Sequence, residues 1–255
     1  RLVQNLEGQL GVDLFRREGR RLKPTEPAQA YARDVRKALD LIARASLGLR
    51  ANPGGGVLRL AILPTFGTRW LAPRLAGFLD ANPGVTLNLG TRMRPFDFAT
   101  EPFDAAIHFG TRSWPGAAHL PLFEERVVAT CSPEFAAANP MQNPEDVQNQ
   151  SLLQLESRPN AWGAWFAHHR LEAPHLQGMM FDQFAPMMQA AVHGVGVALL
   201  PEFLALPEIA EGRLVRTPGD VVSGVGRYEL VWPEDVPLSP ALVAFRDWIA
   251  LAGAQ

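Results

Sequence analysis

A glycine-rich linker divides this 255-residue chain into two segments that fold separately. Pro53 is followed by three glycines, Gly54 to Gly56, and neither a helix nor a strand extends through such a run. The pattern of apolar residues also changes here, from helical spacing before the linker to alternating strands and helices after it. The sequence therefore predicts a small N-terminal module, residues 1–56, and a larger domain, residues 57–255.

The charge of the chain follows the same division. The first 50 residues hold eleven Lys and Arg against six Asp and Glu, a net charge of +5, whereas the remaining residues carry a net charge of −7. The cations are densest in residues 16–23, with five of them against one anion. A basic module joined to an acidic domain is typical of a protein that binds a polyanion with one part and has another task for the rest. The alternative interpretation of residues 16–23 is a solvated loop.

The basic module is predicted to contain two helices. Residues 1–10 have helical spacing, and Gly11 ends that helix. Because Arg1 lies inside this helical pattern, we expect a truncated N-terminus. Thr25 is a suitable N-cap for a second helix, which runs to about residue 50. Its apolar residues form one narrow stripe, typical of a helix that pairs with another helix: Tyr31, Val35, Leu39, Ile42, Ala45 and Leu49. The alternative is a core helix of the next domain.

Strands and helices alternate throughout the larger domain. Strands are predicted at 57–63, 85–91, 103–109, 120–121, 127–131, 151–155, 178–181, 195–200 and 227–232. Helices are predicted at 66–81, 160–169, 183–193, 202–211 and 239–252. This alternation predicts an α/β fold with mostly parallel sheets.

Several classes of function are disfavoured by composition and motifs. No apolar run approaches the roughly 20 residues of a membrane helix, and no secretory signal opens the chain, so we expect a soluble cytoplasmic protein with no membrane partner. The single cysteine, Cys131, follows an apolar strand and is expected to be a packed thiol. The sequence shows no HExxH, no G-x-S-x-G, no Walker loop and no G-x-G-x-x-G before a helix. We therefore expect no metal, no cofactor and no catalytic residue.

Both segments resemble LysR-type transcriptional regulators in their motifs. In the basic module the matching pattern is Val3-x-x-Leu6-Glu7-x-x-Leu10-Gly11-x-x-Leu14-Phe15-x-Arg17, followed by Thr25. In the larger domain the matching motifs are Leu58-Arg59-Leu60, Trp70-Leu71-x-Pro73-Arg74-Leu75, Phe103-Asp104-Ala105-Ala106-Ile107-His108-Phe109-Gly110, Trp114-Pro115-Gly116, Cys131-Ser132-Pro133, Gln189-Ala190-Ala191 and Gly194-Val195-Gly196-Val197-Ala198-Leu199-Leu200-Pro201. They span nearly the whole chain and resemble the branch that includes the glycine-cleavage and β-lactamase-inducing regulators.

The resemblance implies three functional parts. Residues 1–25 correspond to part of a winged helix-turn-helix that binds double-stranded promoter DNA, and 26–56 to a linker helix and hinge. Residues 57–255 correspond to an effector domain like the type II periplasmic binding proteins, with lobe I at about 57–127 and 233–255 and lobe II at about 128–232. A small-molecule effector between the lobes would control promoter binding allosterically. The implied assembly is a homodimer or homotetramer through the linker helix and the effector domain, with RNA polymerase as a further partner.

Six residues of the basic module are candidates for DNA contact. In helix-turn-helix proteins one helix enters the major groove, and flanking cations hold the phosphates. The candidates are Arg1 and Gln4 on the recognition helix, and Arg17, Arg20, Arg21 and Lys23 in the wing. The alternative for each of them is a solvated surface side chain.

The candidate effector site lies in loops at the carboxyl ends of predicted strands, where open α/β sheets bind ligands. Thr65 stands where a buried strand ends and a helix begins, so free N–H groups and the positive end of a helix dipole favour an anionic group there. Gln183 occupies the corresponding turn of the second lobe. The complete candidate set is Thr65, Phe66, Thr68, Asp104, His108, Phe109, Glu156, Gln183, Phe184 and Tyr228. The alternatives are a capping role for Thr65, a structural role for Asp104, and core packing for Phe66 and Phe184.

The resemblance adds one expectation about specificity. In the β-lactamase-inducing branch, positions matching Thr65, Asp104, Phe184 and Tyr228 are associated with the ligand pocket. There the position of Phe184 carries a small hydroxyl residue. We expect the bulkier Phe184 to restrict the cleft and to favour a compact effector.

Two other classes of function stay open on the sequence alone. A solute-binding protein has a similar two-lobed fold, although the basic module and the linker helix argue against it. An enzyme on the same scaffold, such as a deaminase or a dehydratase, needs a catalytic constellation, and the sequence shows none.

Overall fold

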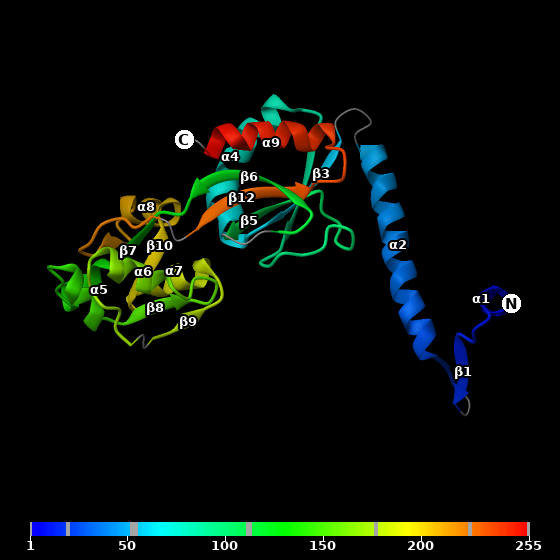
Figure 1. The fold of residues 1–255 in the computed structure, drawn as a ribbon, viewed down its shortest axis with the longest axis horizontal. Coiled ribbons are helices and arrows are strands. Elements are labelled where there is room, and N and C mark those ends of the chain that lie inside the picture. Colours follow the sequence, from blue (N-terminus) through cyan, green and yellow to red (C-terminus); the bar gives the residue numbers. More distant parts are fainter. Residues whose placement is uncertain are drawn as a thin grey trace. The chain divides into compact units, whose positions relative to one another are not determined.

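The computed structural model describes residues 2–18, 21–51, 56–110, 114–175, 178–223 and 226–253 (Figure 1). The chain divides into two units, Arg1–Gly56 and Val57–Gln255, at the linker that the sequence predicts. Among the described residues, none of the helices combines the length and the apolar character of a membrane span.

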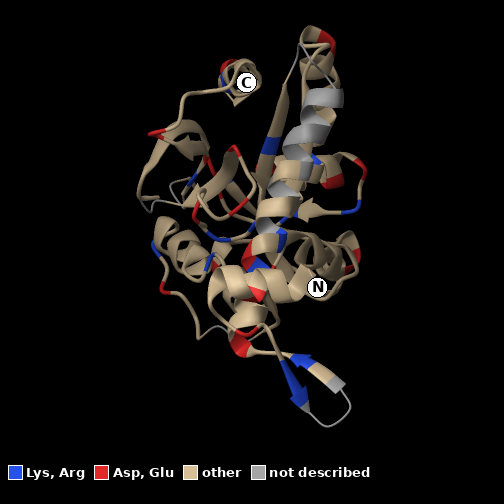
Figure 2. Cartoon of the chain, turned by 90° about the vertical axis from the view of Figure 1, so that its right-hand side faces the viewer, with Lys and Arg blue, Asp and Glu red and all other residues tan. Residues whose placement is uncertain are grey.

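The first unit contains a short helix, a hairpin and a long helix. Its elements are α1 (Leu2–Leu10), β1 (Phe15–Glu18), β2 (Arg21–Pro24) and α2 (Glu26–Ala51). The two strands pair antiparallel, and Lys and Arg are found on both of them (Figure 2). The long helix is longer by one residue than the sequence predicted.

Side chains at the ends of the hairpin hold the first unit together. The carboxylate of Glu7 on α1 accepts hydrogen bonds of 2.8 and 3.2 Å from the backbone N–H groups of Leu14 and Phe15. Thr25 caps α2 as predicted, because its Oγ1 accepts a hydrogen bond of 3.3 Å from the N–H of Ala28. Leu14 and Ala28 are the buried apolar residues in the described part of this unit.

The first lobe of the second unit is built on a five-stranded sheet of order β4-β3-β5-β12-β6. Its strands are β3 (Val57–Ile62), β4 (Thr86–Thr91), β5 (Ala105–Gly110), β6 (Ala117–Glu124) and β12 (Arg227–Pro233). Its helical elements are α3 (Pro64–Phe66), the π-helical turn η1 (Gly67–Leu71), α4 (Ala72–Ala81) and α9 (Pro240–Gly253). All four contribute to one apolar core against the sheet.

The second lobe is built on a five-stranded sheet of order β11-β7-β10-β8-β9. Its strands are β7 (Val127–Cys131), β8 (Leu152–Leu155), β9 (Met180–Phe181), β10 (Val197–Pro201) and β11 (Val215–Arg216). Its helices are α5 (Pro133–Ala138), the 3₁₀ helix η2 (Pro144–Asn149), α6 (Ala161–His168), α7 (Phe184–Val192) and α8 (Glu202–Ala210). The second lobe has two separate apolar cores. Residues of α5 and α6 contribute to one, and residues of α7 and α8 contribute to the other.

Two expectations about the sheets are wrong. Both sheets are mixed rather than mostly parallel, because β12 runs antiparallel to β5 and β6, and β7 runs antiparallel to β10 and β11. In addition, β12 belongs to the sheet of the first lobe, although the expected lobe II extended to residue 232. The chain crosses from the first lobe to the second after β6 and returns before β12. Parallel strands in one sheet are joined by a long crossover connection, usually a helix. A strand that the chain enters from the other lobe has no such crossover, so it can pair antiparallel with its neighbours.

Gly67 packs against the side chain of Ile62, the last residue of β3. A β-carbon at Gly67 would lie 2.3 Å from Cδ1 of Ile62, which is closer than two packed carbons approach. The helix begins at Pro64, two residues earlier than predicted. Thr65 and Phe66 therefore stand in the first helical turn, directly beyond the carboxyl end of β3.

Candidate functional site

A cavity of ≈ 720 Å³ lies between the two lobes of the second unit. It is lined by the carboxyl end of β5 and by the segments that follow β3 and β4 in the first lobe and β8 and β9 in the second. Eight of the ten candidate effector residues line it: Thr65, Phe66, His108, Phe109, Glu156, Gln183, Phe184 and Tyr228. The carboxyl ends of strands from both sheets thus meet at one space, as in other open α/β proteins that hold ligands.

The structure places the other two candidates outside this cavity. Thr68 is exposed, and its hydroxyl donates hydrogen bonds to the carbonyl oxygens of Pro64 and Thr65. Asp104 precedes β5, at the opposite end of that strand from His108, and its carboxylate accepts a hydrogen bond of 2.7 Å from the N–H of Arg59. Burial raises the pKa of Asp104, and the hydrogen bond from Arg59 opposes that rise. Asp104 therefore joins β5 to β3, and we leave it and Thr68 out of the proposed site.

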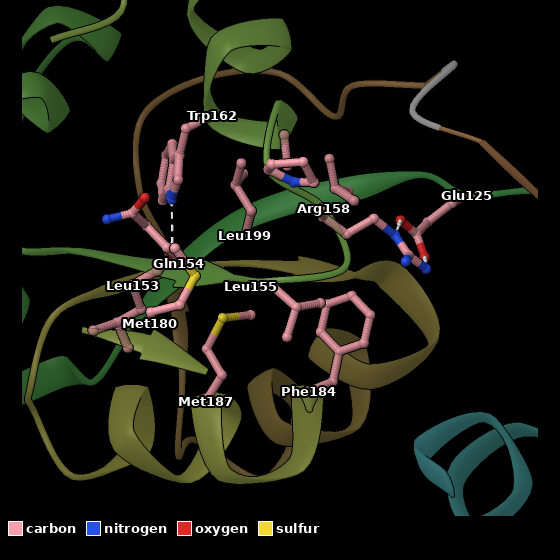
Figure 3. Close-up of a pocket in the computed structure, with 13 residues that line it drawn as sticks. Glu125, Leu153, Gln154, Leu155, Arg158, Trp162, Met180, Phe184, Met187 and Leu199 are labelled. Carbon is pink, nitrogen blue, oxygen red and sulfur yellow. Dashed lines mark hydrogen bonds and ion pairs between the residues drawn. The ribbon is translucent and has the colours of Figure 1, made fainter. Parts of the chain in front are cut away.

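A buried polar network stands beside the cavity, at the connection between the lobes. Glu125 lies between β6 and β7, and only 1% of it is exposed. Its carboxylate oxygens lie 3.0 and 3.2 Å from Nε and Nη2 of Arg158, which follows β8 in the second lobe (Figure 3). Tyr228, on β12 of the first lobe, donates a hydrogen bond of 2.8 Å to Oε1 of Glu125. The network thus links the connection to both lobes.

The environment of Tyr228 keeps its hydroxyl protonated. Burial and the negative charge of Glu125 raise the pKa of Tyr228 well above its ordinary value of 10. The phenol therefore acts as a hydrogen-bond donor throughout the physiological pH range. Its ring is fixed by aromatic neighbours, with ring centroids 5.0 Å from those of both Phe66 and Phe109.

Arg158 is a cation of the cavity that the sequence analysis did not identify. Its guanidinium carbon lies 3.2 Å from the ring centroid of Phe109 and 5.6 Å from that of Phe184, so two candidate residues surround it. Its side chain is only 10% exposed, and it lines the cavity. The sequence offers one weak signal, because Arg158 comes two residues after Glu156, which directly follows the predicted strand 151–155. Its pairing with Glu125 is visible only in three dimensions.

The cavity presents charges of both signs. Arg94 and Arg158 line it together with the exposed acids Glu156 and Asp182. His108 also lines it, and burial lowers the pKa of this imidazole below its ordinary value of 6.5, so the ring is neutral at pH 7. Among the described residues that line the cavity, Arg94 and Arg158 are therefore the cations at neutral pH.

The candidate DNA contacts are distributed over α1 and the hairpin. Gln4 is exposed on α1, and Arg17 and Lys23 are exposed on β1 and β2. Lys23 pairs with Arg16 across the hairpin, whereas Arg17 pairs with Leu22, so Arg17 and Lys23 are on opposite faces. Arg1 and Arg20 lie outside the described residues, as does the side chain of Arg21.

The described ranges hold no group of three or more His, Cys, Asp and Glu that could bind a metal ion. Cys131 is buried in the core of the second lobe, and burial raises the pKa of its thiol to about 11. Such a thiol is protonated and unreactive at neutral pH.

Comparison with known proteins places the chain among bacterial regulators. The family model described as the LysR substrate binding domain matches residues 51–253. The glycine cleavage system transcriptional activator of Escherichia coli K12 is 34% identical over 257 residues, which cover 99% of this chain and 83% of that protein. The transcriptional activator AmpR of Rhodobacter capsulatus is 33% identical over 253 residues, which cover 99% of this chain and 86% of that protein.

The solved structures give the same result. The effector domain of the regulator AmpR of Pseudomonas aeruginosa superposes with a TM-score of 0.71 at 34% sequence identity, covering 78% of this chain and 96% of that domain. These matches confirm the resemblance that the motifs indicate and the α/β effector-domain fold. The named relatives are transcriptional regulators, which agrees with the expectation that the chain is not an enzyme.

Proposed function

Because this chain belongs to the LysR-type family of transcriptional regulators, we propose that its second unit binds a small effector between the two lobes and thereby controls binding to promoter DNA. The observation that carries this proposal is the convergence of strand ends and loops from both lobes on a single cavity. A ligand that touches both lobes favours the relative arrangement in which its contacts are best. The ligand thereby shifts the equilibrium between arrangements of the lobes. The free energy of this shift is coupled to the DNA-binding part.

The proposed effector carries an anionic or strongly polar group that binds near Thr65 and Gln183. The backbone N–H groups of Thr65 and Phe66 belong to a first helical turn, where no intrahelical acceptor exists, and Leu63 before them provides no side-chain cap. Gln183 is the N-cap residue of α7, and its side chain makes no capping hydrogen bond. Both helix starts therefore offer donors to a ligand, and each adds the positive end of a helix dipole.

In the same proposal, the first unit contacts double-stranded DNA in the cytoplasm. Gln4 on α1 faces the bases, and the cations of the hairpin, Arg17 and Lys23 among them, hold the phosphates. The pairing element is α2, on which Tyr31, Leu39 and Ile42 are 40%, 59% and 61% exposed. A second copy of the chain that covers this stripe gives a homodimer. Further contacts through the effector domain give a homotetramer. The assembly acts on RNA polymerase.

The proposal is tested by a thermal-shift screen with small anionic metabolites, followed by DNA binding with each hit. A ligand present at about 100 times its Kd stabilises the folded state by about 2.7 kcal/mol, which raises Tm by roughly 5–10 °C in a domain of this size. We expect one chemical class of hit, and we expect each hit to change the affinity for promoter DNA. Hits that raise Tm while DNA affinity stays constant would contradict the regulatory coupling.

A further inference from the structure

Helix α8 of the second lobe packs directly against the first lobe. Phe203, the second residue of α8, lies among aromatic rings that belong to the first lobe. Its ring centroid lies 5.8 Å from that of Tyr228 and 6.2 Å from those of Phe66 and Phe123. Apolar contacts of this kind are not directional, so they hold the lobes together without fixing their relative orientation.

An ion pair between the lobes lies further along the same helix. Nη2 of Arg69, on the π-helical turn η1 of the first lobe, lies 3.1 Å from Oε1 of Glu208 on α8. The ring pair Phe66–Phe203 joins the same stretch of the first lobe, residues 64–71, to α8. Neither partner of the ion pair lines the interlobe cavity. The lobes are thus joined by a charged contact that a ligand in the cavity leaves untouched.

The carboxylate of Glu208 is charged although its side chain is 0% exposed. Its other oxygen, Oε2, accepts a hydrogen bond from Nε of Arg213, a residue of the same lobe. This hydrogen bond lowers the pKa of Glu208, burial opposes the effect, and the charges of Arg213 and Arg69 lower the pKa further. A buried carboxylate needs such counter-charges. Here it has two, one from each lobe.

The two cations differ in their dependence on the arrangement of the lobes. Arg213 moves with Glu208, because its backbone N–H donates a hydrogen bond of 2.9 Å to the carbonyl oxygen of Glu208 at the end of α8. Arg69 belongs to the first lobe, so a rotation of the lobes separates it from the carboxylate. The attraction between the two charges falls as that distance grows. The ion pair Arg69–Glu208 therefore favours the described arrangement of the lobes over others.

The same stretch of the first lobe also carries the start of the effector site. Thr65 lines the cavity, and Arg69 follows it by four residues, about one helical turn. The described arrangement is the one in which residues of both lobes, such as Thr65 and Gln183, border a single cavity. An effector that touches both walls of this cavity therefore favours the arrangement that the ion pair favours.

We propose that the ion pair Arg69–Glu208 holds the lobes at the spacing of the effector cavity and so couples effector binding to the arrangement of the lobes. The inference rests on the proposed function and names positioning residues of that site, since neither residue contacts the effector. Loss of the pair releases the lobes to a second arrangement, and a bound effector draws them back.

The distance between two spin labels, one on each lobe, tests this inference on the full chain. Asp80→Cys on α4 and Ala167→Cys on α6 place the labels at exposed positions of the first and second lobes. The native Cys131 is buried, so the labels attach to the introduced cysteines. Double electron–electron resonance gives the distribution of distances, and an excess of unlabelled chain suppresses pairs between copies. We expect one main distance in the labelled protein with the ion pair intact.

Three variants separate a contact that sets the lobe arrangement from one that only adds stability. Arg69→Gln should add a second distance, populated roughly tenfold more than with the pair intact. Arg213→Gln is the matched control, since it also removes one cation from Glu208, and it should keep the single distance. Both variants should unfold at a lower urea concentration, so stability alone does not produce the difference. Arg69→Lys keeps the charge beside Glu208 and should restore the main distance.

The small anionic metabolites that raise Tm in the thermal-shift screen provide a second readout. Each of them, added to Arg69→Gln, should return the population to the main distance, because it contacts both walls of the cavity. Metabolites that bind and leave the second distance populated would overturn the coupling.

The remaining outcomes separate this inference from the proposed function. An unchanged distribution in Arg69→Gln, or a second distance in Arg213→Gln as well, would overturn the role of the ion pair and leave the interlobe effector site standing. A screen without a single hit would refute the proposed effector, whereas the distances measured without added metabolite would still decide on the ion pair.

Discussion

The hydroxyl of Tyr228 donates a 2.8 Å hydrogen bond to Glu125, and both side chains are almost completely buried. Tyr228 belongs to the first lobe and Glu125 to the connection between the lobes, where Arg158 of the second lobe also pairs with it. A buried carboxylate needs both a counter-charge and hydrogen-bond donors. The three residues therefore fix the local geometry at the point where one lobe is joined to the other.

Removal of the Tyr228 hydroxyl should destabilise the second unit. Tyr228→Phe leaves Oε1 of Glu125 with one donor fewer in a buried place, so we expect the free energy of unfolding to fall by about 1–3 kcal/mol. Because the pKa of Tyr228 is raised well above 10, the loss should be the same at pH 6 and pH 8. Urea unfolding measures it. The only other tyrosine, the exposed Tyr31, provides the control Tyr31→Phe, and equal losses in the two variants would show that the buried bond contributes nothing.

The half-buried imidazole of His108 should make the protein less stable in acid. Burial lowers its pKa in the folded state, so below the ordinary value of about 6.5 the unfolded chain binds more protons than the folded one. Stability should therefore fall as the pH drops from 7.5 to 5.5, and His108→Gln should lose less over the same range. Urea unfolding at both pH values, with exposed His175→Gln as the control, gives the comparison. An unchanged pH dependence in His108→Gln would contradict this assignment.

The hairpin should contact phosphates rather than bases. Arg16 and Lys23 share one face of the hairpin, so the double variant Arg16→Ala/Lys23→Ala removes two cations from that face. We expect specific and random duplexes to lose affinity by similar factors, and the slope of log affinity against log salt to flatten by about 2. Arg17→Ala, on the opposite face, should flatten the slope less. A loss confined to the specific duplex would instead mean that these side chains read bases.

The apolar stripe of α2 should drive self-association. Val35→Glu/Ile42→Glu places two charges in the stripe that a paired helix would bury, so light scattering should show smaller particles. The exposed pair Arg33→Glu/Arg36→Glu also changes two residues of α2, away from the stripe, and should leave the particle mass unchanged. An unchanged mass in the first variant, with the fold intact by circular dichroism, would contradict pairing through this helix.

Local patterns predict much of this fold because each is set by neighbouring residues. Helical spacing and the Thr25 cap locate α2, and apolar runs locate β3, β7 and β10 within one to two residues. The loops of the site are also predictable, since carboxyl ends of parallel strands meet at one edge of a sheet. Residues of the cavity such as Thr65 and Gln183 are found in this way.

Other features depend on partners that are distant in sequence. The apolar alternation of β12 identifies a strand but carries no information on which of two sheets it joins. Glu125 stands among charged neighbours, Glu124 and Arg126, and such a run is typical of a solvated turn. Its burial follows from Arg158, 33 residues further on, and from Tyr228. Asp104 has the residue type and the motif of a site residue, yet its hydrogen bond to the N–H of Arg59 places it at the other end of β5.

The central claim is that an effector binds between the lobes with its polar group at Thr65. Calorimetric titration of a metabolite panel tests it most directly when it is repeated on Thr65→Val, which keeps the shape and removes the hydroxyl. A hydrogen bond to a charged group is worth about 1.5–3 kcal/mol, so the account predicts that affinity falls roughly ten- to hundredfold. Thr68→Val, three residues along the same helical segment and outside the cavity, should bind like the unmodified protein. Equal affinity in Thr65→Val, or a ligand found outside the interlobe cavity, would contradict the account.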